Sequence, residues 1–354
     1  MTTRQPPATH TIADYERAAT ERMSDDARSY IGGGAGNEIT LRDNEAAWRR
    51  LALRPRALGA PAGADTGVEL LGVRRPHPVL IAPTAFARLT HPDGEIGIAR
   101  AAAATSTIMC LSTFASVSPA AVAAEVPGAA RWFQLYVLSD RGATRELVSA
   151  AGAHGYEALV VTVDRPVLGI RERELRAVLR EGEALGHDRP INTSAVIDPQ
   201  LRWSDVEEVA TESPLPLLVK GVLTAEDARL AAEHGAAGVI VSNHGGRQLD
   251  TVLAGADALP EVVDAVGDRL DVLVDGGIRR GTDVVKALAL GARAVLIGRP
   301  PLWGLAVDGA TGVQRVLETL IAELENALAL VGAPRLTDLD RSFLTAAPWA
   351  GGAR

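Results

Sequence analysis

The stretch VIVSNHGGRQLD, residues 239–250, combines residue types that together could carry out catalysis. A run of Val and Ile stops at polar residues, and His244 and Arg247 follow on a glycine-rich turn. Histidine accepts a proton near neutral pH, and the arginine offers a fixed fork of donors that suits a carboxylate. The pair predicts a base beside a carboxylate clamp, and therefore oxidation or elimination next to an acid group. Because a histidine in an arbitrary glycine turn is usually inert, this prediction depends on the elements around it.

Short β-type runs recur from Val79 onward, and glycines or polar residues follow their C-terminal ends. The eight runs are VLIAP, TIMCLS, RWFQLYV, ALVVTVD, PLLVKG, GVIVSNHG, DVLVDGG and AVLIGR. Ala-rich helical stretches lie between most of them, for example at 94–105, 141–154, 225–234, 259–266 and 283–290. This alternation predicts an α/β fold, a single (β/α)8 TIM barrel, whose chemistry lies where the strands end. An open doubly wound sheet would need a GxGxxG turn after its first strand, and the sequence has none there.

The segments outside this alternation complete the predicted organisation. Residues 1–50 form an N-terminal helical entry segment of the same domain, with helices expected at 12–23, from 24 toward 31, and over TLRDNEAAWRRL. Residues 51–354 form the barrel, with a lid loop at about 172–214, or alternatively a disordered excursion there. The amphipathic stretch GVQRVLETLIAELENALALVG either closes the barrel or makes a subunit contact.

Composition narrows the classes of partner. A net charge of −8 and a pI of about 5.5 argue against nucleic acid and anionic membranes, which require a basic surface. Cys110 is the single cysteine, which excludes an internal disulfide and a multi-cysteine metal site, and no metal is predicted. Residues 1–25 lack an apolar core, and no apolar run approaches the roughly 20 residues of a membrane span. We therefore expect a cytoplasmic protein.

The motif SNHGGRQLD resembles the active-site signature of the FMN-dependent L-2-hydroxy acid oxidase and dehydrogenase family, which includes glycolate oxidase, lactate oxidase and mandelate dehydrogenase. The resemblance extends from Tyr30 to about Gly332 through IAPTAF, HPDGE, LSTFAS, WFQLYV, TVDRPVLGIRERE, LVKGV, DGGIRRGTDVVKALALGA and IGRP. It implies an FMN enzyme that oxidises an L-2-hydroxy acid to the 2-oxo acid. Electrons would pass to O2 or to a diffusible acceptor, and the assembly would be a homotetramer.

The resemblance also implies roles for individual residues. His244 would be the base that removes a proton as two electrons pass to the flavin, and Asp164 would stabilise the protonated imidazole. Tyr136 would hydrogen-bond the hydroxyl that becomes the keto oxygen. Arg171 and Arg247 would hold the substrate carboxylate, and further substrate contacts would come from the hydroxyl groups of Tyr30 and Tyr136.

The cofactor positions follow from the same resemblance. Lys220 would lie against the N1/C2 carbonyl region of the flavin. Arg279 and Arg299, with glycine amides at the ends of the last two strands, would bind the phosphate, and Asp275 would bind the ribityl hydroxyls. The remaining flavin contacts would be Pro83, Thr84, Ala85, Ser112, Gln134, Thr162, Ser242, Gly277 and Gly298.

Some features depart from the family pattern and leave alternatives open. The region between Arg171 and Lys220 is shorter than in typical members, which puts the lid and the handling of oxygen in doubt. Phe114, Ala85 and Leu168 suggest an aliphatic or compact substrate but also permit an aromatic one, such as a mandelate-like acid. A catalytically silent flavin-binding protein and an FMN barrel that isomerises prenyl diphosphates are the rival hypotheses. The choice between oxidase and dehydrogenase, and between hydride and carbanion routes, stays open.

Overall fold

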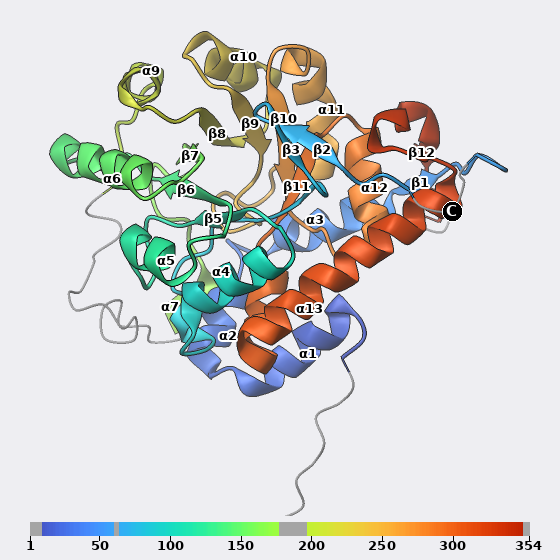
Figure 1. Cartoon of the computed structure of the whole chain (residues 1–354), viewed down its shortest axis with the longest axis horizontal. Helices are drawn as coiled ribbons and strands as arrows, with labels where there is room; N and C mark the ends of the chain where they lie inside the picture. Colours follow the sequence, from blue (N-terminus) through green and yellow to red (C-terminus); the bar gives the residue numbers. More distant parts are fainter. Residues whose placement is uncertain (1–8, 60–63, 177–196, 350–354) are drawn as a thin grey trace, which may run out of the picture.

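The barrel is the central feature of the computed structural model, which describes residues 9–59, 64–176 and 197–349 (Figure 1). Eight parallel strands close on themselves in the order β10-β11-β4-β5-β6-β7-β8-β9. Each coincides with a predicted run, so the (β/α)8 prediction is confirmed. The strands are β4 (Val79–Ile81), β5 (Met109–Leu111), β6 (Arg131–Leu135), β7 (Ala158–Thr162), β8 (Leu217–Val222), β9 (Gly238–Val241), β10 (Asp271–Asp275) and β11 (Ala294–Ile297).

The strands are apolar along nearly their whole length because both faces of the sheet are covered. Every residue of β6, β7, β9 and β11 is buried. Closure of the barrel comes from β11 against β4, where Val295 pairs with Val79 and Ile297 with Ile81. Strands buried on both faces do not alternate between polar and apolar residues, which explains the continuous Val, Ile and Leu runs.

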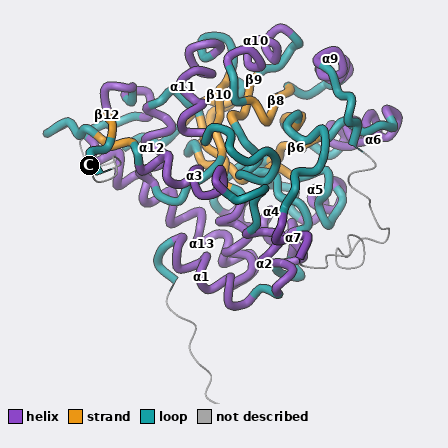
Figure 2. The backbone as a smooth tube through the Cα atoms, turned by 180° about the vertical axis from the view of Figure 1, so that it is seen from behind, coloured by secondary structure: helices purple, strands orange, loops and turns teal. Residues whose placement is uncertain are grey.

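Helices surround the strands and shield the outer face of the barrel (Figure 2). They are α4 (Gly94–Ala104), α5 (Pro119–Glu125), α6 (Arg141–Ala153), α9 (Trp203–Glu212), α10 (Ala225–Glu233), α11 (Gly255–Val266), α12 (Gly281–Ala289) and α13 (Arg299–Val331). The expected C-terminal helix is the second part of α13, which is broken at Asp308 and Gly309 by non-helical backbone angles. The first part of α13 begins directly after β11 and belongs to the barrel.

The N-terminal segment folds as three helices that contact the barrel. These are α1 (Ile12–Arg22), α2 (Asp25–Gly32) and α3 (Ile39–Arg49), and α1 lies along α13 (Figure 1). Side-chain caps at Thr11 and Ser24 begin α1 and α2. Trp48 of α3 is fully buried, and its Nε1 donates to the carbonyl of Gly276, 2.8 Å away. This contact ties the segment to the C-terminal end of β10.

The expectation of a continuous loop at 172–214 is wrong in part. The structure places α7 (Glu172–Arg176) and α9 (Trp203–Glu212) within this range, while residues 177–196 lie outside the described chain. In α9, Val206 and Val209 are buried three residues apart, a helical spacing that the flanking prolines obscure. Two small antiparallel sheets were also not predicted: β1 (Leu51–Leu53) with β12 (Leu344–Ala346), and β2 (Val68–Leu70) with β3 (Val73–Arg75).

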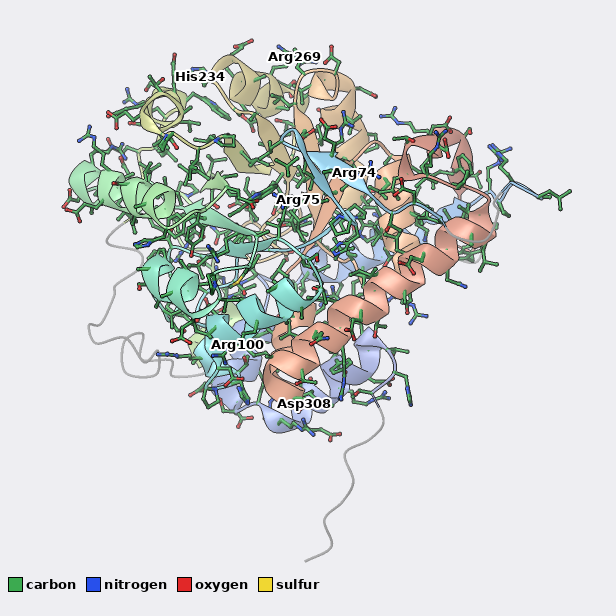
Figure 3. All side chains as sticks on the ribbon, in the orientation of Figure 1. Arg74, Arg75, Arg100, His234, Arg269 and Asp308 are labelled. Atoms are coloured by element: carbon green, nitrogen blue, oxygen red, sulfur yellow. The ribbon has the colours of Figure 1, made fainter. Side chains whose placement is uncertain are left out.

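Charged side chains are spread over the surface, among them Arg74 and Arg100 (Figure 3), and several of them form ion pairs. Arg74 pairs with Asp65 at 2.8 Å, and Arg100 with Glu125 at 3.4 Å. Exposed pairs of this kind contribute little to stability. Within residues 9–59, 64–176 and 197–349, no helix combines the length and apolar character needed to cross a membrane.

Candidate active site

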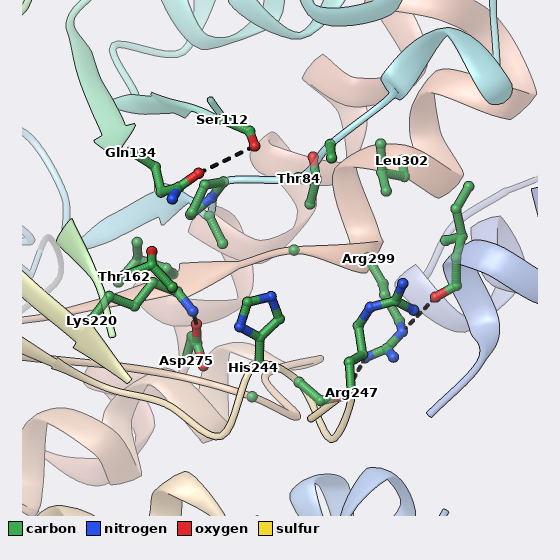
Figure 4. A pocket seen from close by; sticks show the side chains of 18 of the residues that line it. Thr84, Ser112, Gln134, Thr162, Lys220, His244, Arg247, Asp275, Arg299 and Leu302 are labelled. Carbon is green, nitrogen blue, oxygen red and sulfur yellow. Dashed lines mark hydrogen bonds and ion pairs between the residues drawn. The ribbon is translucent and has the colours of Figure 1, made fainter. Parts of the chain in front are cut away.

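A cavity opens at the C-terminal end of the barrel, and each barrel strand or the loop that follows it contributes to the lining. In Figure 4, His244 projects into the space between the Lys220–Asp275 pair and the arginines Arg247 and Arg299. Predicted residues that line this cavity are Tyr30, Pro83, Thr84, Ala85, Ser112, Gln134, Tyr136, Thr162, Arg171, Lys220, His244, Arg247, Asp275, Gly277, Arg279, Gly298 and Arg299. Asp164 and Ser242 lie behind this lining and contact residues that belong to it.

His244 and Asp164 form a hydrogen-bonded pair. Nδ1 of His244 lies 2.8 Å from Oδ1 of Asp164. Burial would raise the pKa of Asp164, but His244 and Lys220 hold it below the usual value, so the group is a carboxylate. A carboxylate only accepts hydrogen bonds, so Nδ1 carries the proton and Nε2 is left with a free lone pair. Burial lowers the pKa of His244 despite the opposing effect of Asp164, which favours the neutral imidazole, the form that can accept a proton.

The backbone at His244 has an uncommon conformation that positions the imidazole next to Asp164. His244 has a φ of +60°, a left-handed conformation that is uncommon outside glycine. Its backbone N–H donates to Oγ of Ser242 at 3.0 Å, which holds the turn. On the neighbouring strand, Gly221 has a φ of +109°, and a Cβ atom there would lie 2.6 Å from Cβ of Asp164. A glycine is therefore required for β8 to pass so close to Asp164.

Lys220 is a buried cation with two nearby partners. Its Nζ donates to Oγ of Ser242 at 2.9 Å and lies 3.2 Å from Oδ2 of Asp275. Burial would lower the pKa of Lys220, but Asp275 and Asp164 outweigh it and raise the pKa, so the ammonium stays charged. The cavity floor thus carries a fixed positive charge close to His244.

Two arginines and a glutamate form a cluster at the mouth of the cavity. Arg171 Nη1 lies 3.2 Å and Arg247 Nη2 lies 2.9 Å from the same oxygen of Glu174. Arg171 also donates through Nε to the carbonyl of Arg247 at 2.9 Å, and the guanidinium carbon of Arg247 lies 4.9 Å from the ring centre of Tyr30. The contacts of Glu174 show that a carboxylate fits between these two guanidinium groups. We did not predict Glu174, although its position three residues after Arg171 on a helix is a signal.

Arg299 lies with Arg279 at the far end of the cavity and is held by backbone carbonyls. Arg299 donates from its three nitrogens to the carbonyls of Ile31, Gly245 and Gly33 at 2.9, 3.1 and 3.1 Å, which joins the N-terminal segment to the turn after β9. Burial, with Arg247 and Arg279 nearby, lowers the pKa of Arg299 to about 9. Such mutual repulsion favours an anion at this end.

The glycines at the same end permit close approach of the backbone. Gly277 has a φ of +79°, and a Cβ atom there would overlap the carbonyl group of Asn44. Gly298 is the N-cap of α13, so the positive end of that helix dipole faces the same region. Arg279 stacks on Trp303, with its guanidinium carbon 4.8 Å from the ring centre, and pairs with Glu45 at 2.9 Å.

Several buried polar atoms in the lining have no hydrogen-bond partner within the described chain. Buried polar groups normally have one, so these atoms indicate a polar ligand. They are Nε2 of Gln134, Oγ1 of Thr162, Oδ1 of Asp275 and Nε of Arg279. Donors at Gln134 and Thr162 suit the carbonyl edge of an isoalloxazine, an acceptor at Asp275 suits ribityl hydroxyls, and the arginine end suits a phosphate. The residues present therefore fit FMN.

An aromatic wall bounds the cavity on the side of Tyr136. The rings of Phe114 and Tyr136 stack with centres 5.3 Å apart, and Phe86 stacks on Phe114 at 6.5 Å. Of the predicted side-chain pocket, Phe114, Ala85 and Leu168 all line the cavity. Sequence reasoning missed Phe86 and Arg165, which also line it and which directly follow predicted site residues.

Amide side chains hold the catalytic turn in place. Asn243 and Asn44 exchange hydrogen bonds of 2.7 and 3.0 Å, and Oδ1 of Asn243 also accepts from the backbone of Gly246. Gln248 accepts from Arg171 at 3.2 Å and donates to the carbonyl of Asp164 at 3.0 Å. We did not predict these two roles, although both residues belong to the quoted motif. In the described part of the chain, His, Cys, Asp and Glu side chains do not gather in groups that could hold a metal ion.

Comparison with known proteins gives consistent matches along almost the whole chain. The pattern of a family described as FMN-dependent dehydrogenase matches residues 19–346. The L-lactate oxidase of a Nostoc species is 47% identical, with 94% of this chain and 97% of that protein covered. Spinacia oleracea glycolate oxidase is 45% identical, with 96% of each chain covered. The solved structure of a mandelate oxidase variant with (S)-mandelic acid has a TM-score of 0.89 at 40% identity, covering 96% of this chain and 99% of that one.

Proposed function

Since the chain belongs to the FMN-dependent dehydrogenase family and is an FMN-dependent oxidoreductase of 2-hydroxy acids, we propose that it is an oxidase acting on the L enantiomer. It converts the hydroxy acid to the 2-oxo acid and passes the electrons to O2. The names of the relatives, L-lactate oxidase and glycolate oxidase, support O2 as acceptor. The observation that carries the proposal is the His244–Asp164 pair, which shares one cavity with the arginine cluster.

The proposed chemistry assigns one task to each polar group. Arg171 and Arg247 bind the substrate carboxylate, and Tyr30 assists them with its hydroxyl. To do so, the substrate shares or displaces the contacts that Glu174 makes with both guanidinium groups. Tyr136, buried in the wall, hydrogen-bonds the substrate hydroxyl. This arrangement fixes the orientation of the reacting carbon relative to His244.

His244 then removes a proton from the substrate. Its Nε2 is the available lone pair, because Nδ1 is engaged with Asp164. Asp164 remains ionised and stabilises the imidazolium that forms. When bound, FMN supplies the acceptor for the two electrons that leave the substrate.

The proposed FMN site is divided among three groups of residues. Lys220 would hold its positive charge near the pyrimidine part of a bound flavin and so stabilise negative charge there. Gln134 and Thr162 offer unpartnered buried donors to the ring edge, and Asp275 an acceptor to the ribityl chain. Arg279 and Arg299 would bind the phosphate at their end of the cavity. The remaining proposed contacts are Pro83, Thr84, Ala85, Ser112, Gly277, Arg279, Gly298 and Arg299, with Ser242 acting through Lys220.

We also propose a domain organisation and a quaternary structure. Residues 1–50 belong to the same domain as residues 51–354, which the ties of Trp48 and Arg299 support. We further propose that the protein is a cytoplasmic homotetramer. Light scattering after size-exclusion chromatography would test the number of subunits. The comparisons do not favour a catalytically silent protein or a larger specialised substrate.

Oxygen consumption tests the proposed acceptor. The purified holoenzyme is mixed with an L-2-hydroxy acid, such as L-lactate or glycolate, in air-saturated buffer. An oxidase consumes one O2 and forms one H2O2 for each 2-oxo acid produced. If the acid turns over with an artificial dye but not with O2, the enzyme is a dehydrogenase and the proposed acceptor is wrong.

A further inference from the structure

Arg165 is a third arginine at the mouth of the same cavity. It directly follows Asp164 at the end of β7 and lines the cavity together with Arg171 and Arg247. Its guanidinium carbon lies 5.3 Å from the ring centre of Tyr136 and 5.6 Å from that of Phe114. The guanidinium is thus held against the aromatic wall. Neither the proposed carboxylate clamp nor the proposed phosphate site includes it.

The electrostatic effects of Arg165 reach both parts of the proposed substrate site. Burial raises the pKa of Tyr136, and the charge of Arg165 is the first effect that opposes it. The same charge reaches Tyr30 and Arg171 beside the clamp. The charge of Arg165 therefore acts both on the clamp residue Arg171 and on the tyrosine that would bind the substrate hydroxyl.

The charges at the mouth favour more than one negative group on the substrate. Among the described residues of the lining there, Arg165, Arg171 and Arg247 are positive and Glu174 is negative, a formal balance of 3 − 1 = +2. A single substrate carboxylate brings this to +1, and a second carboxylate neutralises it. A guanidinium has five N–H donors, so Arg165 can keep its existing contacts and still bind a carboxylate.

We propose that Arg165 binds a second, distal carboxylate and that the substrates are short, dicarboxylic L-2-hydroxy acids. This inference rests on the proposed function, because it requires the first carboxylate to be held by Arg171 and Arg247. Phe114 and Tyr136 line the cavity and offer apolar ring surface to the carbon chain between the two anionic ends. Arg165 selects among 2-hydroxy acids by the charge at their far end.

Length-matched substrate pairs test this assignment. L-Malate is compared with L-2-hydroxybutyrate, and L-2-hydroxyglutarate with L-2-hydroxyvalerate, in anaerobic flavin reduction by the holoenzyme. We expect the dicarboxylic member of at least one pair to have the higher kcat/KM. In Arg165→Gln the ratio of dicarboxylic to monocarboxylic kcat/KM falls roughly 10- to 100-fold, the range for a hydrogen bond to a charged group. Arg165→Lys keeps part of the preference, because it keeps the charge.

A binding measurement and a matched control variant distinguish a specific role of Arg165 from a general effect of the substitution. The oxidised holoenzyme is titrated with 2-oxoglutarate and with 2-oxovalerate, and Kd follows from the change in flavin absorbance. Arg165→Gln weakens binding of 2-oxoglutarate more than that of 2-oxovalerate. Arg173→Gln serves as control, because Arg173 pairs with Glu38 outside the cavity and its loss leaves both ratios unchanged.

Each result has a distinct meaning. If no 2-hydroxy acid reduces the flavin, the proposed function itself fails. If monocarboxylic acids reduce it and Arg165→Gln lowers both members of a pair equally, Arg165 assists the first carboxylate and the inference is overturned. A preference for aromatic acids that is lost in Arg165→Gln would also overturn it, in favour of stacking on the guanidinium.

Discussion

At the scale of single residues, the proposed proton transfer depends on which nitrogen of His244 is free. The hydrogen bond from Nδ1 to Asp164, at 2.8 Å, fixes the tautomer and leaves Nε2 facing the cavity. The left-handed backbone at His244 is maintained by Gly245 and Gly246, which also have positive φ values, and by Asn243. The proposed base is therefore positioned before any substrate arrives, which is the condition for effective proton transfer.

Replacing the base tests its role directly. His244→Ala should still bind FMN and remain yellow, because the proposed cofactor contacts lie elsewhere in the cavity. Flavin reduction by substrate should fall about 10²- to 10⁴-fold, the usual contribution of a general base. Anaerobic stopped-flow absorbance measures this rate. His234→Ala is the matched control, since His234 follows α10 on the periphery (Figure 3) and packs at a tilt against Trp203; a similar loss there would refute the assignment.

The pH profile gives a second test at this scale. His244 must be neutral to accept a proton, so kcat/KM is full above its pKa and declines as the pH falls through it. Since burial lowers this pKa below its model-compound value of 6.5, the acidic limb should lie below pH 6.5. Asp164 raises the pKa of His244, so Asp164→Asn should slow the reaction and move the limb to still lower pH. A limb that moves to higher pH in Asp164→Asn would contradict this arrangement.

At the scale of elements, the eight barrel strands could be predicted because long buried runs carry a clear pattern. The strands β1, β2, β3 and β12 lie outside the β/α alternation and are only partly buried, whereas the equally short β4 and β5 are fully buried and belong to it. The position of His244 after β9 follows from the sequence, whereas its contact with Asp164 depends on the pairing of β7, β8 and β9. The contact of Glu174 with Arg247 and those of Arg165 with Phe114 and Tyr136 were missed because they join residues that are distant in the sequence.

The turn after β10 provides a prediction at the element scale. Gly277→Ala should lose FMN and lower stability by about 2 to 4 kcal/mol, because the new Cβ atom meets the backbone of Asn44 at a positive φ. Thermal unfolding and the ratio of absorbance at about 450 and 280 nm measure the two effects. Gly128→Ala is the control, since no atom lies within 4 Å of its added Cβ. Equal effects of the two substitutions would contradict the close-packing argument.

At the scale of the whole molecule, the cavity joins the N-terminal segment, the β9 turn and the last barrel strands. Arg299 connects these parts by donating hydrogen bonds to three backbone carbonyls. The nearby positive charges of Arg247 and Arg279 repel it. A bound phosphate would relieve this repulsion and stabilise all three parts together. Cofactor binding and global stability should therefore be coupled.

Cofactor removal tests this coupling. The apoprotein should melt several degrees below the holoenzyme, and FMN at 100 times its Kd should restore about 2.7 kcal/mol. Arg279→Ala should weaken FMN binding, because it removes a cation from the proposed phosphate end. Differential scanning fluorimetry across an FMN titration measures both effects. An unchanged melting temperature on addition of FMN would show that the cofactor does not join these parts.

The central claim is that His244 takes a proton from a 2-hydroxy acid held beside FMN. Anaerobic mixing of the holoenzyme with a panel of L-2-hydroxy acids, monocarboxylic and dicarboxylic, tests it most directly through the flavin absorbance near ~450 nm. The account predicts that at least one acid bleaches the flavin and yields one 2-oxo acid per flavin, and that His244→Ala with FMN bound does not bleach on the same timescale. Bleaching at the same rate in both proteins, or none with any acid in the wild-type holoenzyme, would contradict it.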